Sequence, residues 1–244
     1  MSETIVPYKE NTGTKKEQVR EMFNNISPKY DLLNRLLSGG IDRYWRKRAI
    51  GKLKKSSPKL ILDVATGTAD LAIAAIKLNP EKIIGIDLSE QMVAIGREKV
   101  AKKGLANRIE LQTGDSENLP FQNNYFDAVI VSFGVRNFEN LEKGLSDIHR
   151  VLHAGGTLVV LEFSKPKGWF IGGLYQFYFK YILPLIGRMI SKDQSAYTYL
   201  PQSVNAFPEG DKFVQILKNV GFTGAEFERL SFGICSVYTA KKAG

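Results

Sequence analysis

The stretch Leu60-Ile61-Leu62-Asp63-Val64-Ala65-Thr66-Gly67-Thr68-Ala69-Asp70 decides the fold of this chain. Its apolar first half predicts a buried strand, its small residues a tight turn, and residues 71–78 a helix. A second apolar run at residues 82–87 ends in Asp87, which lies 20 residues after Gly67. A strand, a glycine turn, a helix and a second strand ending in an acid together predict a Rossmann-like unit whose carboxylate binds a ribose.

The composition of this turn favours one kind of ligand. A dinucleotide site needs several glycines, because the backbone must approach a pyrophosphate. Here Gly67 is the single glycine of the turn, and a Walker-type lysine is missing. We therefore expect a nucleoside without phosphates, S-adenosylmethionine (SAM), which has a ribose, an adenine and a zwitterionic tail. The alternative is a structural turn that binds no ligand.

Composition sets limits on the class of protein. The chain has 244 residues, 43% of them hydrophobic and 24% charged, which indicates one globular domain with additions. One cysteine, Cys235, excludes an internal disulfide framework, and two histidines beside it are too few for a usual zinc site. With so few of these ligands, we expect no metal. The first residues lack a basic segment followed by an apolar one, so we expect a cytoplasmic protein.

The net charge of +9 predicts attraction to something anionic. Basic residues crowd between Arg43 and Lys59, and no acid interrupts them. RNA or an anionic membrane surface would suit such a run, and a solvated helix face is the plainer alternative.

The order of apolar and polar segments predicts an α/β fold. Residues 1–14 are expected to be flexible, and residues 15–55 to form helices, with Asp42 as the N-cap of one of them. Further helices are expected at residues 89–103, 141–152 and 213–220. The remaining strands are expected at residues 108–113, 126–132 and 157–163, with a hairpin at 225–230 and 234–240. This alternation predicts a doubly wound, Rossmann-like sheet of seven strands in one domain, residues 15–244.

Residues 169–190 do not fit a plain α/β pattern, because they are dense in aromatic and aliphatic side chains. The segment nearly reaches membrane-spanning length, but Lys180 and Pro184 interrupt it, so we do not expect a span. It is either a buried helix or part of a lid, residues 166–205, that meets an apolar substrate.

Four pieces of the sequence carry a resemblance to a known family. They are residues 30–38 with Trp45, residues 118–121 (NLPF), residues 132–137 (SFGVRN), and residues 150–166, which end in EFSKP. With these pieces the chain resembles, from about residue 15 onward, the quinone-biosynthesis C-methyltransferases, a group of class I SAM-dependent methyltransferases. Departures are Asp42 in place of a histidine, His153-Ala154 in place of Lys-Pro, and Ala69 in place of a glycine.

The resemblance and the strand ends together assign a SAM site. Its expected residues are Asp63, Thr66, Gly67, Thr68, Asp87, Asp115, Ser116 and Ser132. Asp87 would accept both ribose hydroxyls, Asp115 and Ser116 would contact the adenine, and Ser132 would lie beside the sulfonium. The turn backbone would face the methionine part, with Asp63 beneath it, either orienting the turn or purely structural. Thr68 is as well suited to cap the following helix.

The reaction that the resemblance implies is methylation of a ring carbon of a prenylated quinol. Demethylmenaquinol is the expected substrate, and the methoxybenzoquinol of ubiquinone biosynthesis is the alternative. Loss of a phenol proton makes the ortho carbon nucleophilic, and a cation beside the oxygen lowers the pKa of the phenol. Arg136 suits that role, unless it only anchors its loop. Tyr197, Tyr199 and Asp193 could supply hydrogen bonds or a base.

The expected partner is therefore a quinol in a membrane, reached by peripheral contact through residues 169–190 and some of the basic residues between Arg43 and Lys59. Nucleic acid is not expected as a partner, and a homo-oligomer is compatible with the sequence. Two other functions stay open: an RNA methyltransferase, suggested by the charge, and a non-catalytic protein of the same fold that binds a partner or lipid.

Overall fold

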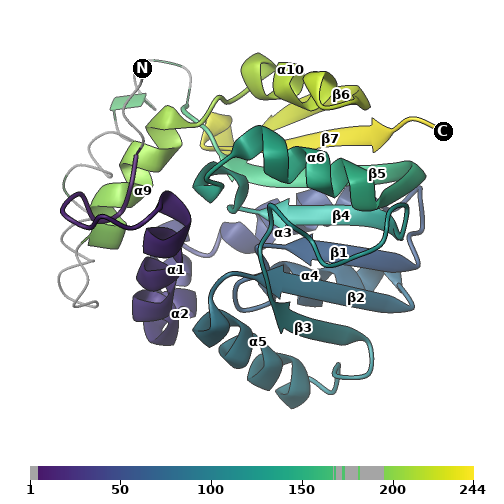
Figure 1. The fold of residues 1–244 in the computed structure, drawn as a ribbon, viewed down its shortest axis with the longest axis horizontal. Coiled ribbons are helices and arrows are strands. Elements are labelled where there is room, and N and C mark those ends of the chain that lie inside the picture. Colours follow the sequence, from purple (N-terminus) through teal and green to yellow (C-terminus); the bar gives the residue numbers. More distant parts are fainter. Residues whose placement is uncertain (1–4, 167, 169–171, 174–180, 182–194) are drawn as a thin grey trace.

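Seven strands form one mixed sheet, in the order β3-β2-β1-β4-β5-β7-β6 (Figure 1). The computed structural model describes residues 5–166, 168, 172–173, 181 and 195–244. The first five strands are parallel, and β7 is antiparallel to both of its neighbours, which confirms the Rossmann-like fold with a closing hairpin. The strands are β1 (Leu60–Val64), β2 (Lys82–Asp87), β3 (Ile109–Thr113), β4 (Phe126–Ser132), β5 (Leu152–Phe163), β6 (Phe222–Leu230) and β7 (Cys235–Lys242).

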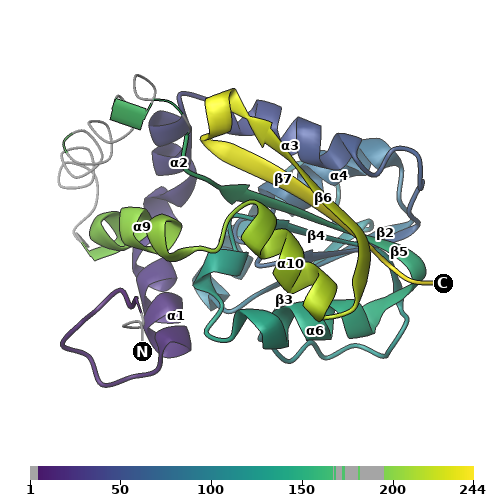
Figure 2. The same cartoon turned by 90° about the horizontal axis from the view of Figure 1, so that it is seen from above.

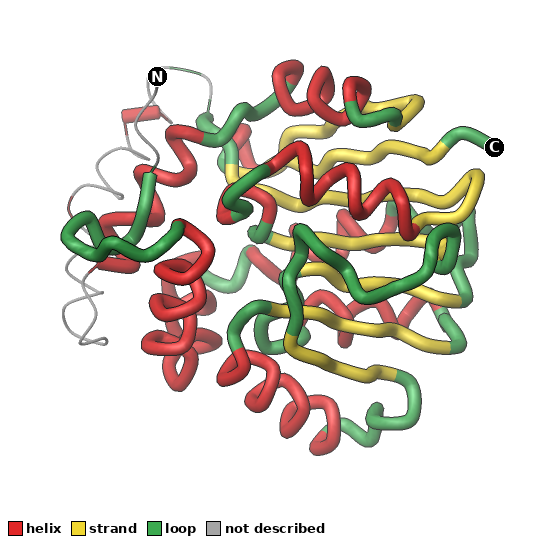
Figure 3. The backbone as a smooth tube through the Cα atoms, viewed as in Figure 1, coloured by secondary structure: helices red, strands yellow, loops and turns green. Residues whose placement is uncertain are grey.

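Helices cover both faces of the sheet (Figures 2 and 3). One face carries α3 (Asp42–Gly51), α4 (Asp70–Ala75) and α5 (Glu90–Lys102), and the other carries α6 (Leu141–Val151) and α10 (Asp211–Asn219). Alternate strand residues enter the two cores: Ile61 packs on the first face and Leu62 on the second. Because both faces of the sheet are buried, β1 reads as a nearly continuous apolar run in the sequence.

A third, smaller core lies at the carboxyl ends of the parallel strands. It is built by α1 (Lys15–Ile26), α2 (Tyr30–Ser38) and α9 (Ser195–Ala206), beside the start of α5 (Figure 1). Thr14 and Glu17 form a capping box that starts α1, and a 3-10 turn at Ser27–Lys29 separates α1 from α2. Its buried apolar residues include Val19, Met22, Ile26, Leu33, Met92, Ala196, Tyr197 and Tyr199.

Two local expectations differ from the structure. The N-cap of α3 is Ile41, so the expected capping by Asp42 is wrong; the Asp42 carboxylate instead accepts from Ser38 Oγ at 2.8 Å and pairs with Arg46. Strand β5 begins at Leu152 rather than at residue 157. In the pairing of β4 with β5, Phe126 lies opposite Leu152, but Ala128 lies opposite Thr157. This shift in register indicates a bulge in β5.

The apolar segment at residues 169–190 falls almost entirely outside the described residues, which include Gly172, Gly173 and Tyr181 from it. Asp193 also falls outside them. In the described part of the chain, no helix combines the length and apolar character that crossing a bilayer requires.

Candidate active site

A cavity opens where the order of the sheet reverses, between β1 and β4. Ligands of doubly wound sheets bind at this switch point, outside the carboxyl ends of the strands. Gly67 after β1, Asp87 at the end of β2, and Ser132 at the end of β4 line the cavity. Its volume is about 660 Å³, solvent at the mouth included, which is within the usual range for small-molecule sites.

The turn after β1 has an unusual backbone, because three of its residues have positive φ. Ala65, Gly67 and Ala69 have φ values of 54°, 55° and 67°. Gly67 has room above it, since a Cβ there would lie 3.9 Å from the Tyr30 ring. Ala69 occupies the place where the resemblance expects glycine, and at this φ an alanine carries a steric cost that glycine lacks.

Asp63 lies beneath this turn and holds it. Its Oδ2 accepts from Thr66 Oγ1 at 2.7 Å and from the Ala72 amide at 3.1 Å. The side chain is buried, and neither Asp63 nor Thr66 lines the cavity. Burial raises the pKa of Asp63 from its ordinary 3.8 to about 7. Both side chains therefore orient the turn instead of reaching into the cavity.

This pKa shift predicts a pH-dependent stability. Between pH 4 and 7 folded Asp63 keeps a proton that the unfolded chain has lost, so the free energy of unfolding should fall as the pH rises. The Asp63→Asn variant cannot titrate. The wild-type free energy of unfolding minus that of the variant should therefore fall by at most about 1.4 kcal/mol per pH unit across this window. Denaturant melts between pH 4 and 8 measure it; a flat difference would show that Asp63 is ionised throughout.

Asp87 is placed to bind a diol. Its Oδ2 accepts from the Gly67 amide and its Oδ1 from the Ser89 amide, both at 2.8 Å. These bonds fix the carboxylate on the cavity wall and leave each oxygen a further lone pair. Burial raises the pKa of Asp87, and the backbone amides oppose that rise. The residues present at this position thus fit the ribose of SAM.

Thr68 does not cap the helix that follows it. The N-cap of α4 is Ala69, without a side-chain hydrogen bond, so capping by Thr68 is wrong. Its hydroxyl donates to Asp31 Oδ1 at 2.6 Å and accepts from Lys99 Nζ at 2.9 Å. Thr68 does not line the cavity, and it ties the turn to α2 and α5.

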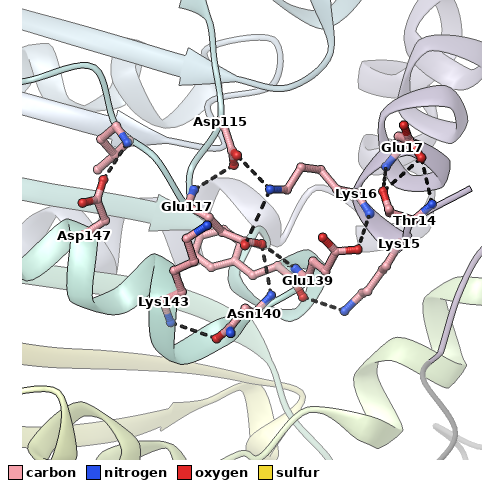
Figure 4. A network of polar contacts seen from close by, with 12 residues as sticks. Thr14, Lys15, Lys16, Glu17, Asp115, Glu117, Glu139, Asn140, Lys143 and Asp147 are labelled. Atoms are coloured by element: carbon pink, nitrogen blue, oxygen red, sulfur yellow. Dashed lines mark hydrogen bonds and ion pairs between the residues drawn. The ribbon is translucent and has the colours of Figure 1, made fainter.

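Helix α1 forms one wall of the cavity, and no local sequence pattern predicts this placement. Lys16 Nζ contacts Asp115 Oδ2 at 2.8 Å, while Asp115 Oδ1 accepts from the Glu117 amide at 2.8 Å (Figure 4). Ser116 lines the cavity, and Asp115 lies beside it without lining it. The other lining residues from α1 are Val19, Arg20 and Phe23.

The same helix is tied to the loop after β4. Lys15 Nζ donates to the carbonyl oxygens of Arg136 and Phe138, at 3.1 and 2.7 Å. Asn137, from this loop, lines the cavity, and its amide oxygen is buried without a hydrogen-bond partner among the described residues. Such an acceptor is a candidate for binding a ligand hydroxyl.

Arg136 is buried in an ion pair. Its Nη1 lies 2.7 Å from Glu162 Oε1 and also donates to the Phe133 carbonyl, and its guanidinium lies 5.5 Å from the centre of the Phe163 ring. Arg136 does not line the cavity, whereas Phe133 does. Its Nε has no hydrogen-bond partner in the described part of the structure. The arginine thus anchors its loop and keeps one donor free.

The positive charge of Arg136 influences the pKa of two tyrosines. Tyr30 lines the cavity, and Tyr199 belongs to the core of the N-terminal helices. Burial raises the pKa of both tyrosines, that of Tyr199 to about 12, and Arg136 opposes the rise in each. Tyr199 therefore stays protonated at neutral pH and can donate but not act as a base. Tyr197 is buried in the same core and does not line the cavity.

Ion pairs with acidic side chains compensate part of the positive charge of the basic run between Arg43 and Lys59. Arg46 pairs with Asp42 and with Asp70, and Glu228 pairs with both Arg48 and Lys52. Asp42, four residues from Arg46, and the more distant Asp70 and Glu228 thus neutralise part of the run.

Comparison with known proteins gives a consistent result. The model of the ubiE/COQ5 methyltransferase family matches residues 11–242. The chain is 51% identical, over 98% of both chains, to a demethylmenaquinone methyltransferase of Bacteroides fragilis. It is 45% identical to the ubiquinone/menaquinone biosynthesis C-methyltransferase UbiE of Geotalea daltonii, over 93% of this chain and 97% of that protein.

Solved structures resemble the fold at low sequence identity. A SAM-dependent methyltransferase of Thermotoga maritima superposes with a TM-score of 0.63 at 19% identity, covering 91% of this chain and 99% of that one. A methyltransferase of Methanococcus maripaludis, described as SAM-dependent, gives 0.62 at 18% identity, covering 97% and 98%. At such identities the likeness concerns the fold alone.

Proposed function

Because the chain belongs to the ubiE/COQ5 methyltransferase family, we propose that it transfers a methyl group from SAM to a ring carbon of demethylmenaquinol, a prenylated quinol. The observation that carries this proposal is the cavity at the switch point, with the Asp87 carboxylate and the Gly67 turn on its wall. The benzoquinol of ubiquinone biosynthesis is the second candidate, because the name of the Geotalea relative includes both quinones.

In this proposal SAM lies along the carboxyl ends of β1, β2 and β3. Asp87 accepts from the two ribose hydroxyls, and the Gly67 backbone approaches the methionine part. Ser116 contacts the adenine, and Asp115 accepts from its amino group while remaining paired with Lys16, since a carboxylate has further acceptor sites. Ser132 lies on the sulfonium side. When bound, SAM supplies an electrophilic methyl group on sulfur.

The quinol becomes a nucleophile by losing a phenolic proton to solvent water, and Arg136 favours that loss. As the ring carbon bonds to the methyl group the sulfur–methyl bond breaks, S-adenosylhomocysteine leaves, and the ring carbon then loses its proton to water while the phenolate regains one. The charge of Arg136 already opposes the rise in pKa of the phenols of Tyr30 and Tyr199, and it would act in the same direction on a quinol hydroxyl beside them. Arg136 remains protonated, so it is an electrostatic stabiliser and not the base. Asn137 could accept from the second hydroxyl through its buried amide oxygen.

A prenylated quinol stays in the bilayer, so the protein should be cytoplasmic and contact a membrane peripherally. The segment at residues 169–190, dense in apolar side chains, is one candidate for that contact. An RNA methyltransferase is disfavoured, because part of the basic run is already neutralised by Asp42, Asp70 and Glu228.

One incubation separates these functions. The protein, labelled SAM and a reductant are mixed with demethylmenaquinol, a methoxybenzoquinol or total cellular RNA in parallel. We expect label in the organic extract with demethylmenaquinol, and none above background with RNA. Labelled RNA and unlabelled quinones would contradict the proposal, whereas preference for the benzoquinol would favour the second candidate.

A further inference from the structure

Large apolar side chains project into solvent at the corner between α2 and α3 and at the turn between β6 and β7. Phe232 is 79% exposed, and the other four are between 47% and 53% exposed. We call this set the α2–α3 face; its members are Leu32, Leu36, Ile41, Tyr44 and Phe232. Single exposed apolar residues are ordinary, but a group on one side of a molecule marks an interaction surface.

These side chains belong together although they are distant in sequence. Leu32 and Leu36 are one helical turn apart on α2, Ile41 precedes α3, and Tyr44 lies in its first turn. The Trp45 indole donates to Ser231 Oγ at 2.8 Å, which holds the turn bearing Phe232 against α3. That turn lies beside α3, at the end of the molecule that carries the cavity (Figure 2).

Phe232 is held outward at a conformational cost. Its φ is 58° and its ψ 20°, in the left-handed region that bulky side chains rarely adopt, and Ser231 before it has φ 48°. Neither burial nor packing compensates for this, because the ring is exposed. Positive φ at successive residues is the geometry of a tight hairpin turn, and here it places a large exposed ring where glycine or asparagine is usual.

The surroundings of these side chains are cationic. Arg35, Arg43 and Lys47 are exposed and form no ion pair within the described residues. The nearby acids are already engaged: Asp42 pairs with Arg46, and Glu228 with Arg48 and Lys52. Apolar side chains that project beyond a ring of unpaired cations are complementary to a bilayer with anionic head groups.

We propose that the α2–α3 face inserts into the head-group region of an anionic phospholipid bilayer and so brings the cavity to its quinol. The proposal rests on the proposed function for the identity of the substrate, but not for the docking itself. The side chains come from three separate segments and none of them lines the cavity, which suits a fluid bilayer better than a folded partner.

An aromatic cluster lies between this face and the cavity. Trp45 packs edge-on against Phe133 and Phe163, each at 6.1 Å between ring centres, and the latter two stack at 4.4 Å. Phe133 lines the cavity, and Trp45 is bonded to the turn of Phe232. Packed rings thus connect the turn of Phe232 to the wall of the cavity.

Vesicle partitioning of the full chain tests the proposal. The double variant Leu36→Ser with Phe232→Ser should bind vesicles of phosphatidylglycerol and phosphatidylcholine at least tenfold more weakly than the wild type. Arg43→Gln and Lys47→Gln should each lower binding to these vesicles about fivefold, with no effect on vesicles of phosphatidylcholine alone. The matched control is Tyr125→Ser, an aromatic residue 46% exposed at the opposite end of the strands, which should bind like the wild type.

Activity measurements separate docking from function. The double variant and the Tyr125→Ser control should both methylate a short-chain, water-soluble demethylmenaquinol at the wild-type rate. The double variant alone should lose turnover on a long-chain quinol in vesicles. Vesicle binding that depends on the α2–α3 face, without methylation of either quinol, would support docking and contradict the proposed function.

Two results would overturn the proposal. One is wild-type vesicle binding by the double variant; if its oligomeric state changed at the same time, the face would be an interface between copies of the chain. The other concerns Phe232→Trp, which keeps a large ring in place should the double variant fail to fold. Its added fluorescence must be quenched by brominated lipids, and unquenched emission on bound vesicles would exclude insertion.

Discussion

Replacing Asp87 with alanine should weaken SAM binding at least a hundredfold. The carboxylate lies on the cavity wall, fixed by the Gly67 and Ser89 amides, and is the group that we expect to accept both ribose hydroxyls. Each hydrogen bond to a charged group contributes about 1.5–3 kcal/mol, and about 1.4 kcal/mol corresponds to a factor of ten in affinity. Titration calorimetry with SAM, beside thermal melts, measures the effect.

Asp127 offers a matched control for this variant. It too accepts two backbone amides, those of Lys59 and Leu60, each at 2.7 Å, but at the opposite end of the strands. The Asp127→Ala variant should lose stability and keep its SAM affinity. If both alanine variants lost affinity in proportion to their stability, Asp87 would be a structural carboxylate and the ribose assignment would be wrong.

Replacing Arg136 with glutamine should lower kcat by about two to three orders of magnitude, the usual effect of removing a group that stabilises developing charge. Arg136→Lys should recover little, because an ammonium lacks the Nε donor that is left unpaired here and the planar group that lies over the Phe163 ring. SAM affinity should change much less, since Arg136 does not line the cavity.

The ion pair complicates this variant, because Glu162 would be left buried without its partner. Breaking a buried pair from one side typically costs about 3–5 kcal/mol of stability. The double variant Arg136→Gln with Glu162→Gln removes both charges and should recover the melting temperature but not kcat. Arg150→Gln is the control, because Arg150 pairs with Asp147 and bonds carbonyl groups away from the cavity. Recovered turnover in the double variant would reduce Arg136 to a loop anchor.

Local sequence patterns predicted the sheet and the edge of it, at the carboxyl ends of the parallel strands, where the cavity lies. Four of the parallel strands contain apolar runs and β3 alternates apolar and polar residues, so the strands were readable, and parallel strands bring their carboxyl ends to one edge. The sequence alone therefore predicted one site for Gly67, Asp87 and Ser132, and all three line the cavity. The exception is the start of β5, because its bulge follows no period of two.

What escaped prediction depends on contacts between distant segments. Lys16 meets Asp115 across 99 residues, and Arg136 meets Glu162 across 26, with no repeating pattern that links either pair. Local capping rules failed at Asp42 and at Thr68, because Arg46 and Lys99 offered their side chains stronger, charged partners. Tyr30 and Asn137 belong to motifs already singled out by the resemblance, and that signal could have placed them on the cavity.

The position of the transferred methyl group tests the central claim most directly. The protein is incubated with SAM carrying a ¹³C-labelled methyl group and reduced demethylmenaquinol, and the extracted quinone is analysed by NMR. We predict a labelled methyl bonded to the unsubstituted ring carbon next to a quinone carbonyl, with no label when Asp87→Ala replaces the wild type. Label on a quinol oxygen, or an unlabelled quinone from a protein that binds SAM, would contradict the account.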